Sequence, residues 1–357
     1  VVPSIDEILE QSLTLLDSDG TDVWEMWQRK MTEIEEHSIL RSFLWCESTC
    51  SLLRNIRCSN IYLADAMNTL CTLDSVQPLT AEVLGSVYES LLELHPQIDC
   101  ASWTVTLSTK DGHVRKTTGS YYTPISLINR LLDSTLEPVM NKAIHGKSQS
   151  EQERALLALR ICDPSCGSGY FLVAAVRRLA TRLGRIRSRD TESTPDVVQI
   201  ALREVVRTCI YGVDINPMSV ELCKVSLWML ILEPRKPLPF LDAQIQCGNA
   251  LLGTQPDQID QGIQTAYFTL IKQRDERPVR NRLAAKNRRE IKQEALIQMP
   301  RNPHGSLFDM VCAIHAIDDG RLDGAIQKQA MWQAFQQSSV YQREILLADT
   351  LVASMAR

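Results

Sequence analysis

The sequence lacks the close cysteine pairs of a metal-binding domain. It contains 11 cysteines among 357 residues, but none forms a C-x-x-C pair. The closest pairs, Cys46 with Cys50 and Cys162 with Cys166, are separated by one residue too many for a zinc knuckle. We therefore expect scattered, reduced thiols and no metal site.

Long apolar segments are also absent. The longest strongly apolar run near the middle of the chain, residues 225–232, is far too short to cross a bilayer. The first residues do not show the charged segment followed by an apolar segment that is typical of a secretory signal. We therefore expect a cytoplasmic protein that does not associate with a membrane.

Charge is distributed unevenly along the chain. The formal net charge is -5, but residues 1–99 hold 17 acidic and 5 basic residues, so the remainder carries a positive balance. Two basic clusters stand out, one of six arginines between Arg177 and Arg189 and one of nine Lys and Arg residues between Lys272 and Lys292. Basic clusters of this kind are more often solvated helix faces than nucleic-acid contacts.

The first 95 residues contain little glycine and show apolar residues at helical spacing. The clearest helix runs from Thr80, a suitable N-cap, to Leu94, where Pro96 stops it. Residues 103–107 then alternate as a strand does, and residues 113–117 are predicted to return as the second arm of a hairpin.

A loop and a helix follow this hairpin. Thr123 and Pro124 are predicted to be the N-cap and first residue of a helix over residues 125–140. Tyr121 and Tyr122 would then lie in the loop at the start of this helix. From these residues alone, two interpretations stay open: the tyrosines contribute to a site, or they only pack at the helix entrance.

The centre of the chain has the pattern of a strand, a glycine turn and a helix. An apolar run from Leu157 ends at Asp163, Gly167 and Gly169 follow, and apolar residues at helical spacing continue from Leu172. The glycines allow the backbone to approach a ligand closely. The start of the helix offers unpaired N–H groups to that ligand.

Two more predicted strands follow, and each ends at a polar residue. Strands are predicted at residues 209–214 and 243–247, with helices at 195–206 and 218–232. This order implies an α/β fold with a parallel sheet and right-handed crossovers. Residues 255–357 are predicted to form a largely helical accessory region.

The ends of parallel strands meet at one edge of a sheet, so Asp163, Asp214 and Asn249 are expected to converge there. A carboxylate after the second strand is suited to the hydroxyls of a ribose, and an amide after the third is suited to an adenine edge. The ligand therefore carries an adenosine.

Phosphate-bearing adenosine ligands fit the turn poorly. Gly169 is followed by Tyr170 and Phe171 in place of the lysine and hydroxyl of a phosphate-binding loop. A dinucleotide fingerprint needs a third glycine and an acid about 20 residues on, whereas the next strand-end acid is Asp214. S-adenosylmethionine is the leading candidate, with its ammonium met by Asp163 or by carbonyls of the turn.

Several segments resemble motifs of the N6-adenine DNA methyltransferases of bacterial restriction-modification and phage-defence systems. Asp163–Leu172 closely resembles the D-P-A-C-G-S-G-x-F-L motif of that family. The preceding, second and third motifs of the family resemble Thr118–Pro124, Gly212–Pro217 and Gly248–Leu252. Leu84–Leu92 resembles a helical signature found before the methyltransferase domain in large, type IIG-like members.

The resemblance implies a partial Rossmann-like, S-adenosylmethionine-dependent methyltransferase fold. Its expected parts are a helical N-terminal region (1–100), a partial methyltransferase domain with the cofactor site (101–254) and the helical accessory region (255–357). It assigns Thr123 and Tyr122 to the methionine end, Asp163 and Gly167 to the amino group, Asp214 to the ribose and Asn249 to the adenine. The complete set of implied cofactor-binding residues is Tyr121, Tyr122, Thr123, Pro124, Asp163, Pro164, Gly167, Gly169, Phe171, Asp214, Ile215 and Asn249.

The chain departs from the family at its catalytic tetrapeptide, Asn/Asp/Ser-Pro-Pro-Tyr/Phe/Trp. No Pro-Pro occurs in the 357 residues, and in the family this motif holds the flipped adenine. We therefore expect this chain to be an excised piece of a longer protein. We assign no catalytic residue to it and expect it to be inactive alone.

The complete protein would act on double-stranded DNA, with other defence-system subunits as further expected partners. Two alternatives stay open. One is a non-catalytic assembly module with a methyltransferase fold, and the other is a methyltransferase that acts on RNA or protein.

Overall fold

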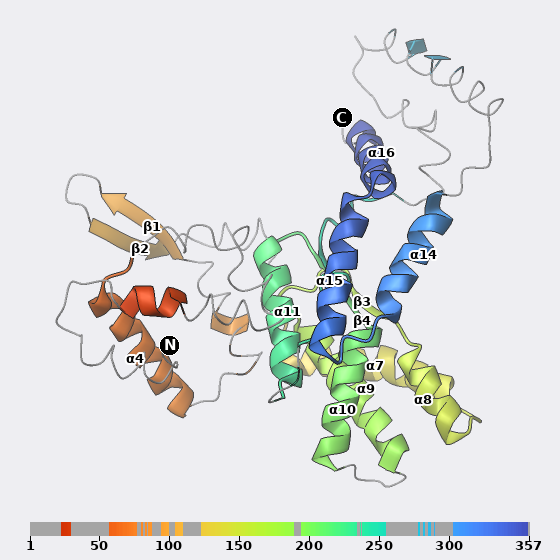
Figure 1. The fold of residues 1–357 in the computed structure, drawn as a ribbon, viewed down its shortest axis with the longest axis horizontal. Coiled ribbons are helices and arrows are strands. Elements are labelled where there is room, and N and C mark those ends of the chain that lie inside the picture. The colour runs from red at the N-terminus through yellow and green to blue at the C-terminus, as the bar shows by residue number, and fades with distance from the viewer. Residues whose placement is uncertain are drawn as a thin grey trace. The chain divides into compact units, whose positions relative to one another are not determined.

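The computed structural model describes most of the centre of the chain and its C-terminal helices (Figure 1). The described residues are 23–29, 57–76, 94–99, 104–109, 123–188, 194–233, 238–254 and 303–355, together with isolated positions between these ranges. By their contacts they divide into two units. One comprises residues 1–248 with 319–325, and the other comprises 249–318 with 326–357.

Three short parallel strands form the sheet of the first unit. Their bounds are Ile161–Asp163 (β3), Ile210–Asp214 (β4) and Ile245–Cys247 (β5). Their order is β3-β4-β5, with Asp163 opposite Gly212 and Asp214 opposite Cys247. The predicted parallel sheet with crossover helices is therefore present, although each strand is short and the described residues are mostly helical.

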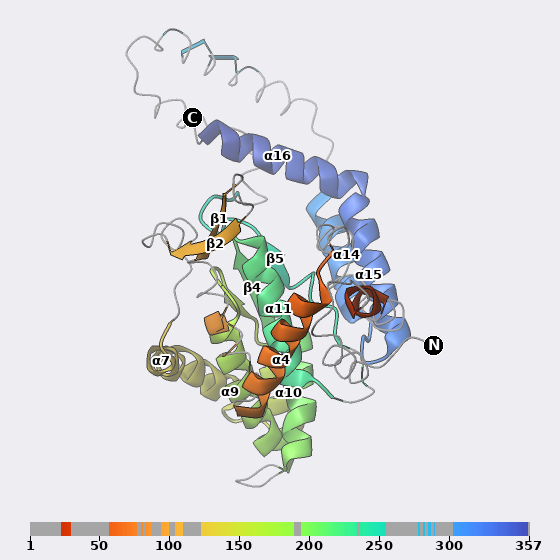
Figure 2. The same ribbon diagram turned by 90° about the vertical axis from the view of Figure 1, so that its left-hand side faces the viewer.

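Helices α9 (Tyr170–Ser188) and α10 (Pro195–Cys209) connect β3 to β4, and α11 (Pro217–Ile231) connects β4 to β5. Helices α9 and α10 lie side by side (Figures 1 and 2). Apolar residues of α9 recur every three or four positions and are fully buried. Each such side chain contributes about 1.5–3 kcal/mol through burial. The buried residues of α9 include Leu172, Val176, Leu179 and Leu183.

The strand before the glycine turn is shorter than the apolar run that predicted it. Leu157, where the predicted run begins, is instead the last residue of helix α8 (Gln149–Leu157), in which Leu156 is fully buried. Ser148 and Glu151 form a capping box at the start of this helix. The helix continues through Leu157, because the N–H of Ala158 still donates to the carbonyl of Arg154 at 3.0 Å, so this part of the apolar run is helical.

Helix α7 covers Ile125–Ile144 and is longer than predicted. Pro124 itself occupies the N-cap position, and no side chain caps the helix, so the prediction that Thr123 is the N-cap is wrong. The carbonyl of Pro124 accepts hydrogen bonds from Leu127 and Ile128. The helix continues through Pro138 and buries one face on the core.

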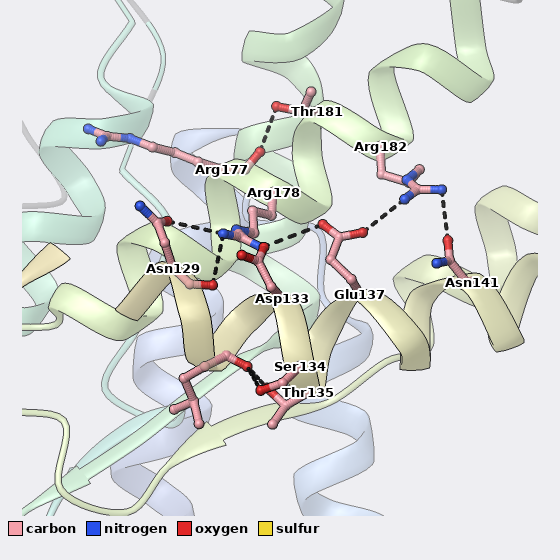
Figure 3. A network of polar contacts seen from close by, with 11 residues as sticks. Asn129, Asp133, Ser134, Thr135, Glu137, Asn141, Arg177, Arg178, Thr181 and Arg182 are labelled. Carbon is pink, nitrogen blue, oxygen red and sulfur yellow. Dashed lines mark hydrogen bonds and ion pairs between the residues drawn. The ribbon is translucent and has the colours of Figure 1, made fainter. Parts of the chain in front are cut away.

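Arginines of α9 pair with carboxylates of α7 in what we call the α7–α9 ion-pair cluster (Figure 3). Arg178 contacts Asp133 directly and lies 3.8 Å from Glu137. Arg182 donates to Glu137 at 2.9 Å and to Asn141 at 3.0 Å. The arginines on this side of α9 are therefore used in packing helices together.

Arg187, at the end of α9, is engaged in the same way. It contacts Glu153 of α8 at 3.0 Å and Glu204 of α10 at 2.6 Å. Arg185 is exposed. The basic cluster between Arg177 and Arg189 thus contains three arginines that hold neighbouring helices and is not a uniform solvated face.

Part of the N-terminal region is not helical. Helix α4 spans Asn60–Val76, but β1 (Leu94–Asp99) pairs antiparallel with β2 (Thr104–Thr109). The predicted strand near residue 105 is therefore present, but its observed partner precedes it in the chain. The predicted partner, residues 113–117, lies outside the described residues.

Three helices form the described part of the C-terminal region, namely α14 (Pro303–Ala316), α15 (Leu322–Gln337) and α16 (Ser339–Met355). Trp332 stacks on Phe335 with ring centroids 5.2 Å apart, and Phe335 contacts Tyr341 at 4.5 Å. The helical character predicted after residue 255 is confirmed for these residues. The three-part domain division stays a prediction.

None of the helices among the described residues is long and apolar enough to cross a membrane.

Candidate cofactor-binding site

The turn after β3, residues 164–169, is built on two glycines in the left-handed region. Gly167 has φ of 53° and Gly169 has φ of 91°, a conformation that other residues adopt only with strain. A Cβ on Gly169 would lie 2.9 Å from Sγ of Cys223, whereas a Cβ on Gly167 would meet no atom within 4 Å. Gly169 therefore allows the turn to pack on α11, and Gly167 leaves open space beside the turn.

Asp214, at the end of β4, joins this turn to the start of α11. Its Oδ2 accepts a hydrogen bond from the backbone N–H of Gly167 at 2.9 Å, and its Oδ1 accepts one from Asn216 at 2.8 Å. Only 7% of Asp214 is exposed. Because both oxygens are oriented by backbone N–H groups, the remaining lone pairs of this carboxylate have fixed directions.

Backbone hydrogen bonds fix the same edge of the sheet. The N–H of Cys166 donates to the carbonyl of Val213 at 2.9 Å, and the N–H of Gly248 donates to the carbonyl of Asp214 at 2.9 Å. At the start of α11, Asn216 accepts the N–H of Met218 at 3.0 Å and so caps the helix, as its sequence position before Pro217 predicts.

Asp163 lies near Asp214, and one of its two carboxylate oxygens accepts a backbone hydrogen bond. Its Oδ1 accepts the N–H of Ser165 at 3.0 Å, and among the described residues its Oδ2 has no hydrogen-bond partner. Burial raises the pKa of Asp163; the hydrogen bond from Ser165 acts in the opposite direction, and the negative charge of Asp214 raises the pKa further. The site thus contains a partly desolvated carboxylate that a cation would stabilise.

Two thiols lie beneath the turn, and the sequence pattern did not identify them as a pair. Cys166 is 5% exposed and Cys223 is fully buried. The hydrogen bond to Cys166, together with burial, raises the pKa of Cys223 well above its ordinary value. A buried thiol with a raised pKa is inert, so the sulfur of Cys223 serves as packing under the turn.

The remaining predicted residues of the first unit lie at different depths. Ile215 is 58% exposed directly after Asp214, and Pro164 is exposed at the start of the turn. Phe171 packs partly buried against the hydrophobic core. Thr123 is half-buried and Pro124 is exposed. Tyr121 and Tyr122 lie outside the described residues, so their predicted role is untested.

Asn249 is the first residue of the second unit. Its Oδ1 accepts hydrogen bonds from the N–H groups of Leu251 at 2.9 Å and Leu252 at 3.0 Å. The side chain of Asn249 is therefore hydrogen-bonded within its own loop, and the contact of Asn249 with an adenine stays a prediction. The structure brings together Asp163 and Asp214 of the three predicted strand-end residues.

Over the ranges that the structure describes, no three His, Cys, Asp or Glu side chains are grouped in a way that would hold a metal ion. The cysteines in these ranges are free thiols.

Comparison with known proteins relates this site to DNA methyltransferases. Residues 140–254 match the family model described as "MmeI, DNA-methyltransferase domain". This match contains β3, β4, β5, the glycine turn and Asn249. A DNA-methyltransferase domain of this type is therefore present in the chain.

Three relatives extend the comparison. A Methanocaldococcus jannaschii protein, named as a type II restriction enzyme and methyltransferase, is 25% identical over 51% of this chain and 17% of its own length. The type II restriction enzyme and methyltransferase RM.Eco57I of Escherichia coli is 25% identical over 50% of this chain and 18% of its own length. The adenine-specific methyltransferase PglX of Streptomyces coelicolor is 33% identical over 32% of this chain and 8% of its own length.

These findings confirm the predicted resemblance over about half the chain, to relatives named as type II restriction enzymes and methyltransferases and, over a shorter part, to one named as an adenine-specific methyltransferase. The chain spans less than a fifth of the length of each of these relatives.

Proposed function

We propose that this chain is the S-adenosylmethionine-binding part of a DNA adenine-N6 methyltransferase. The observation that carries the proposal is the bridge made by Asp214, whose carboxylate accepts N–H groups from the turn after β3 and from the start of α11. This bridge holds a strand-end carboxylate beside a glycine turn that is open on one side. Ligands of parallel α/β sheets bind at such an edge.

The charge of this edge favours the proposed cofactor over a nucleotide. Asp163 and Asp214 lie together, and neither has an ion pair with a basic residue in the part of the chain that the structure describes. Two carboxylates repel the phosphates of ATP or NAD and attract a cation. S-adenosylmethionine carries an ammonium and a sulfonium but no phosphate.

The residues of the edge match the parts of this cofactor. Oδ2 of Asp163 would accept a hydrogen bond from the ammonium, while the open side of Gly167 leaves room for the methionine end. The lone pairs of Asp214 that the backbone leaves available would accept the ribose hydroxyls. Ile215, exposed next to Asp214, and Asn249 would contact the adenine.

The residues on the other side of the cofactor are proposed from the family motif alone. Tyr121, Tyr122, Thr123 and Pro124 would cover the methionine end. When bound, the cofactor supplies a methyl group activated by the neighbouring sulfonium charge. The role of this chain is to orient that group by fixing both ends of the molecule.

Methylation of adenine in double-stranded DNA is proposed for the complete protein, because relatives are named adenine-specific and restriction-associated methyltransferases. No Pro-Pro tetrapeptide occurs in the 357 residues. We therefore propose that the chain binds cofactor without methylating DNA, since the group that holds the flipped base would come from elsewhere.

Calorimetry with S-adenosylmethionine and S-adenosylhomocysteine tests the cofactor proposal. The chain should bind both, and Asp214→Ala should weaken binding by about 100-fold, because it removes a buried acceptor of two ribose hydroxyls. Asp323→Ala is the matched control, because this carboxylate is 78% exposed, and it should bind as the parent does.

A folded parent chain that binds neither compound would refute the proposal and favour a non-catalytic assembly module. Turnover on DNA by the chain alone would refute the proposal that the chemistry is incomplete. Methyl transfer by the complete protein to RNA or protein, without transfer to DNA, would refute the choice of substrate.

A further inference from the structure

The helical segment around Gly85 contacts the glycine turn directly. Gly85 is buried and helical. A Cβ at this position would lie 2.7 Å from Oγ of Ser168 and 3.3 Å from Cε2 of Tyr170. Real Cβ atoms essentially never approach another heavy atom as closely as 2.7 Å. The absence of a side chain at Gly85 therefore lets this helix touch the turn.

The contact lies at the residues that set the shape of the turn. Ser168 stands between Gly167, which donates its N–H to Asp214, and Gly169, whose N–H closes the turn on the carbonyl of Cys166 at 2.8 Å. Tyr170 is the first residue of α9 and packs against the core. The turn is therefore confined by α11 beneath Gly169 and by the Gly85 helix at Ser168.

Helix propensity does not explain a glycine at this position. Glycine inside a helix costs about 1 kcal/mol relative to alanine. The segment has its own N-cap, because Thr80 accepts the N–H of Val83 at 3.3 Å. A glycine within a capped helix, buried against a turn, is explained by close approach.

We propose that Gly85 is a positioning residue for the cofactor: the helix that carries it holds Ser168 and so fixes the N–H of Gly167 toward Asp214. This inference rests on the proposed cofactor function. It links residues 83–87 of the acidic N-terminal region to the occupancy of the site. The surface that this helical segment contacts is the glycine turn of the same chain.

Calorimetry on a double-mutant cycle of Gly85→Ala and Ser168→Ala in the full 357-residue chain tests this inference. Gly85→Ala forces Ser168 to move and should weaken S-adenosylmethionine binding by about tenfold, the effect of an overpacked contact. Gly85→Ala with Ser168→Ala removes the 2.7 Å clash and leaves a nearest contact of 3.3 Å. The double variant should bind within about threefold of Ser168→Ala, because the two sites are coupled through this contact.

A purely structural role would appear as a loss of thermal stability in Gly85→Ala, which the double variant would regain, whereas a positioning role lowers affinity in a chain that stays folded. Thermal unfolding without cofactor should show Gly85→Ala folded. If it does not fold, hydrogen exchange on the parent chain decides: S-adenosylmethionine should slow exchange of the amides at 83–87, because binding and helix docking are reciprocally linked.

The outcomes separate the two proposals. No binding by the parent refutes the proposed function. If the parent binds, three results would refute the positioning role of Gly85 and leave the proposed function standing. They are an unchanged affinity in Gly85→Ala, an equal loss of affinity in Gly85→Ala and the double variant, and amide exchange at residues 83–87 that the cofactor does not slow.

Discussion

Carboxylates occur in two opposite settings in this protein. In the α7–α9 ion-pair cluster, Asp133 and Glu137 face arginines of a neighbouring helix. At the strand ends, Asp163 and Asp214 accept backbone N–H groups and lie close enough to influence each other electrostatically, with no basic partner among the described residues. The first setting neutralises charge within the fold, and the second leaves the negative charge without a basic partner among the described residues.

Under the proposed function, the acids of the first setting serve stability and those of the second serve cofactor binding. A paired carboxylate lowers the free energy of the folded chain. An ionised acid that is partly buried beside another acid raises the free energy of the folded chain unless a bound cation offsets its charge. Neutralising Asp163 should therefore raise stability and breaking an ion pair of the α7–α9 cluster should lower it, and only substitutions at the strand ends should change cofactor affinity. Asp214 differs from Asp163 in this respect, because its carboxylate also joins two backbone N–H groups of the fold.

The largest effect is expected at Asp319, a fully buried example of the paired kind. It accepts from Arg207 and from the N–H of Phe240 at 3.1 Å. Asp319→Ala leaves both donors without this acceptor and should lower the free energy of unfolding by about 3 kcal/mol. Urea denaturation measures this loss, with Asp323→Ala as an exposed control; a loss below about 1 kcal/mol would contradict the assignment.

Asp163→Asn should separate binding from stability most clearly. It keeps an acceptor for the N–H of Ser165 but removes the negative charge, so S-adenosylmethionine affinity should fall by about 10- to 100-fold. The midpoint of thermal unfolding at neutral pH should rise, because a destabilising charge is gone.

The matched control for this prediction is Asp133→Asn in the α7–α9 ion-pair cluster. It should lower the midpoint slightly and leave affinity unchanged. The same direction of change in stability for both variants would remove the distinction between the two settings.

The pH dependence of binding should follow Asp163. Its pKa is raised by burial and by Asp214 from an ordinary value of 3.8. The folded-state pKa of Asp163 lies above its unfolded-state pKa. The contribution of Asp163 to stability is therefore lost as the pH rises from the unfolded-state pKa through the folded-state pKa. Cofactor affinity should rise over the same interval, because the ammonium needs the ionised carboxylate.

Calorimetry from about pH 4 to about pH 7 measures this dependence, which spans the ordinary carboxyl range and the shifted one. Asp163→Asn should remove most of the increase in affinity. A parent chain whose affinity is constant over this range would exclude Asp163 as the partner of the ammonium.

The smallest effect is expected within the α7–α9 ion-pair cluster. Arg182→Ala should cost about 0.5–1 kcal/mol of stability, the size expected for a partly exposed ion pair. Affinity should not change. A double-mutant cycle with Glu137→Ala, followed by chemical denaturation, gives the pair energy, and a change in cofactor affinity would mean that this surface also supports the site.

Local features of the fold were predictable from short sequence patterns. Gly167 and Gly169 marked a turn and have positive φ. The helix predicted over residues 218–232 corresponds to α11, which Asn216 caps in front of Pro217. Each of these features depends on a backbone preference of one or two residues, so the sequence carries it directly.

Other features were missed or assigned incorrectly because distant residues decide them. Leu94–Asp99 forms β1, although Pro96 is a poor strand residue, because pairing with β2 satisfies its backbone. Leu157 ends α8 and does not begin β3; Leu156 before it is buried in the core, and the thiol of Cys209 donates to the carbonyls of both leucines, contacts that the local pattern does not encode.

The sequence by itself determined the order of strand, glycine turn and helix, and it placed a carboxylate at the end of two strands. Only the tertiary structure decided what those carboxylates contact. Gly167 donates to Asp214 across 47 positions, Cys223 packs under Gly169, and Gly85 meets Ser168. Periodicity and turn preference encode local conformation, whereas contacts between distant segments form only when the helices pack, so they leave no repeating signal in the chain.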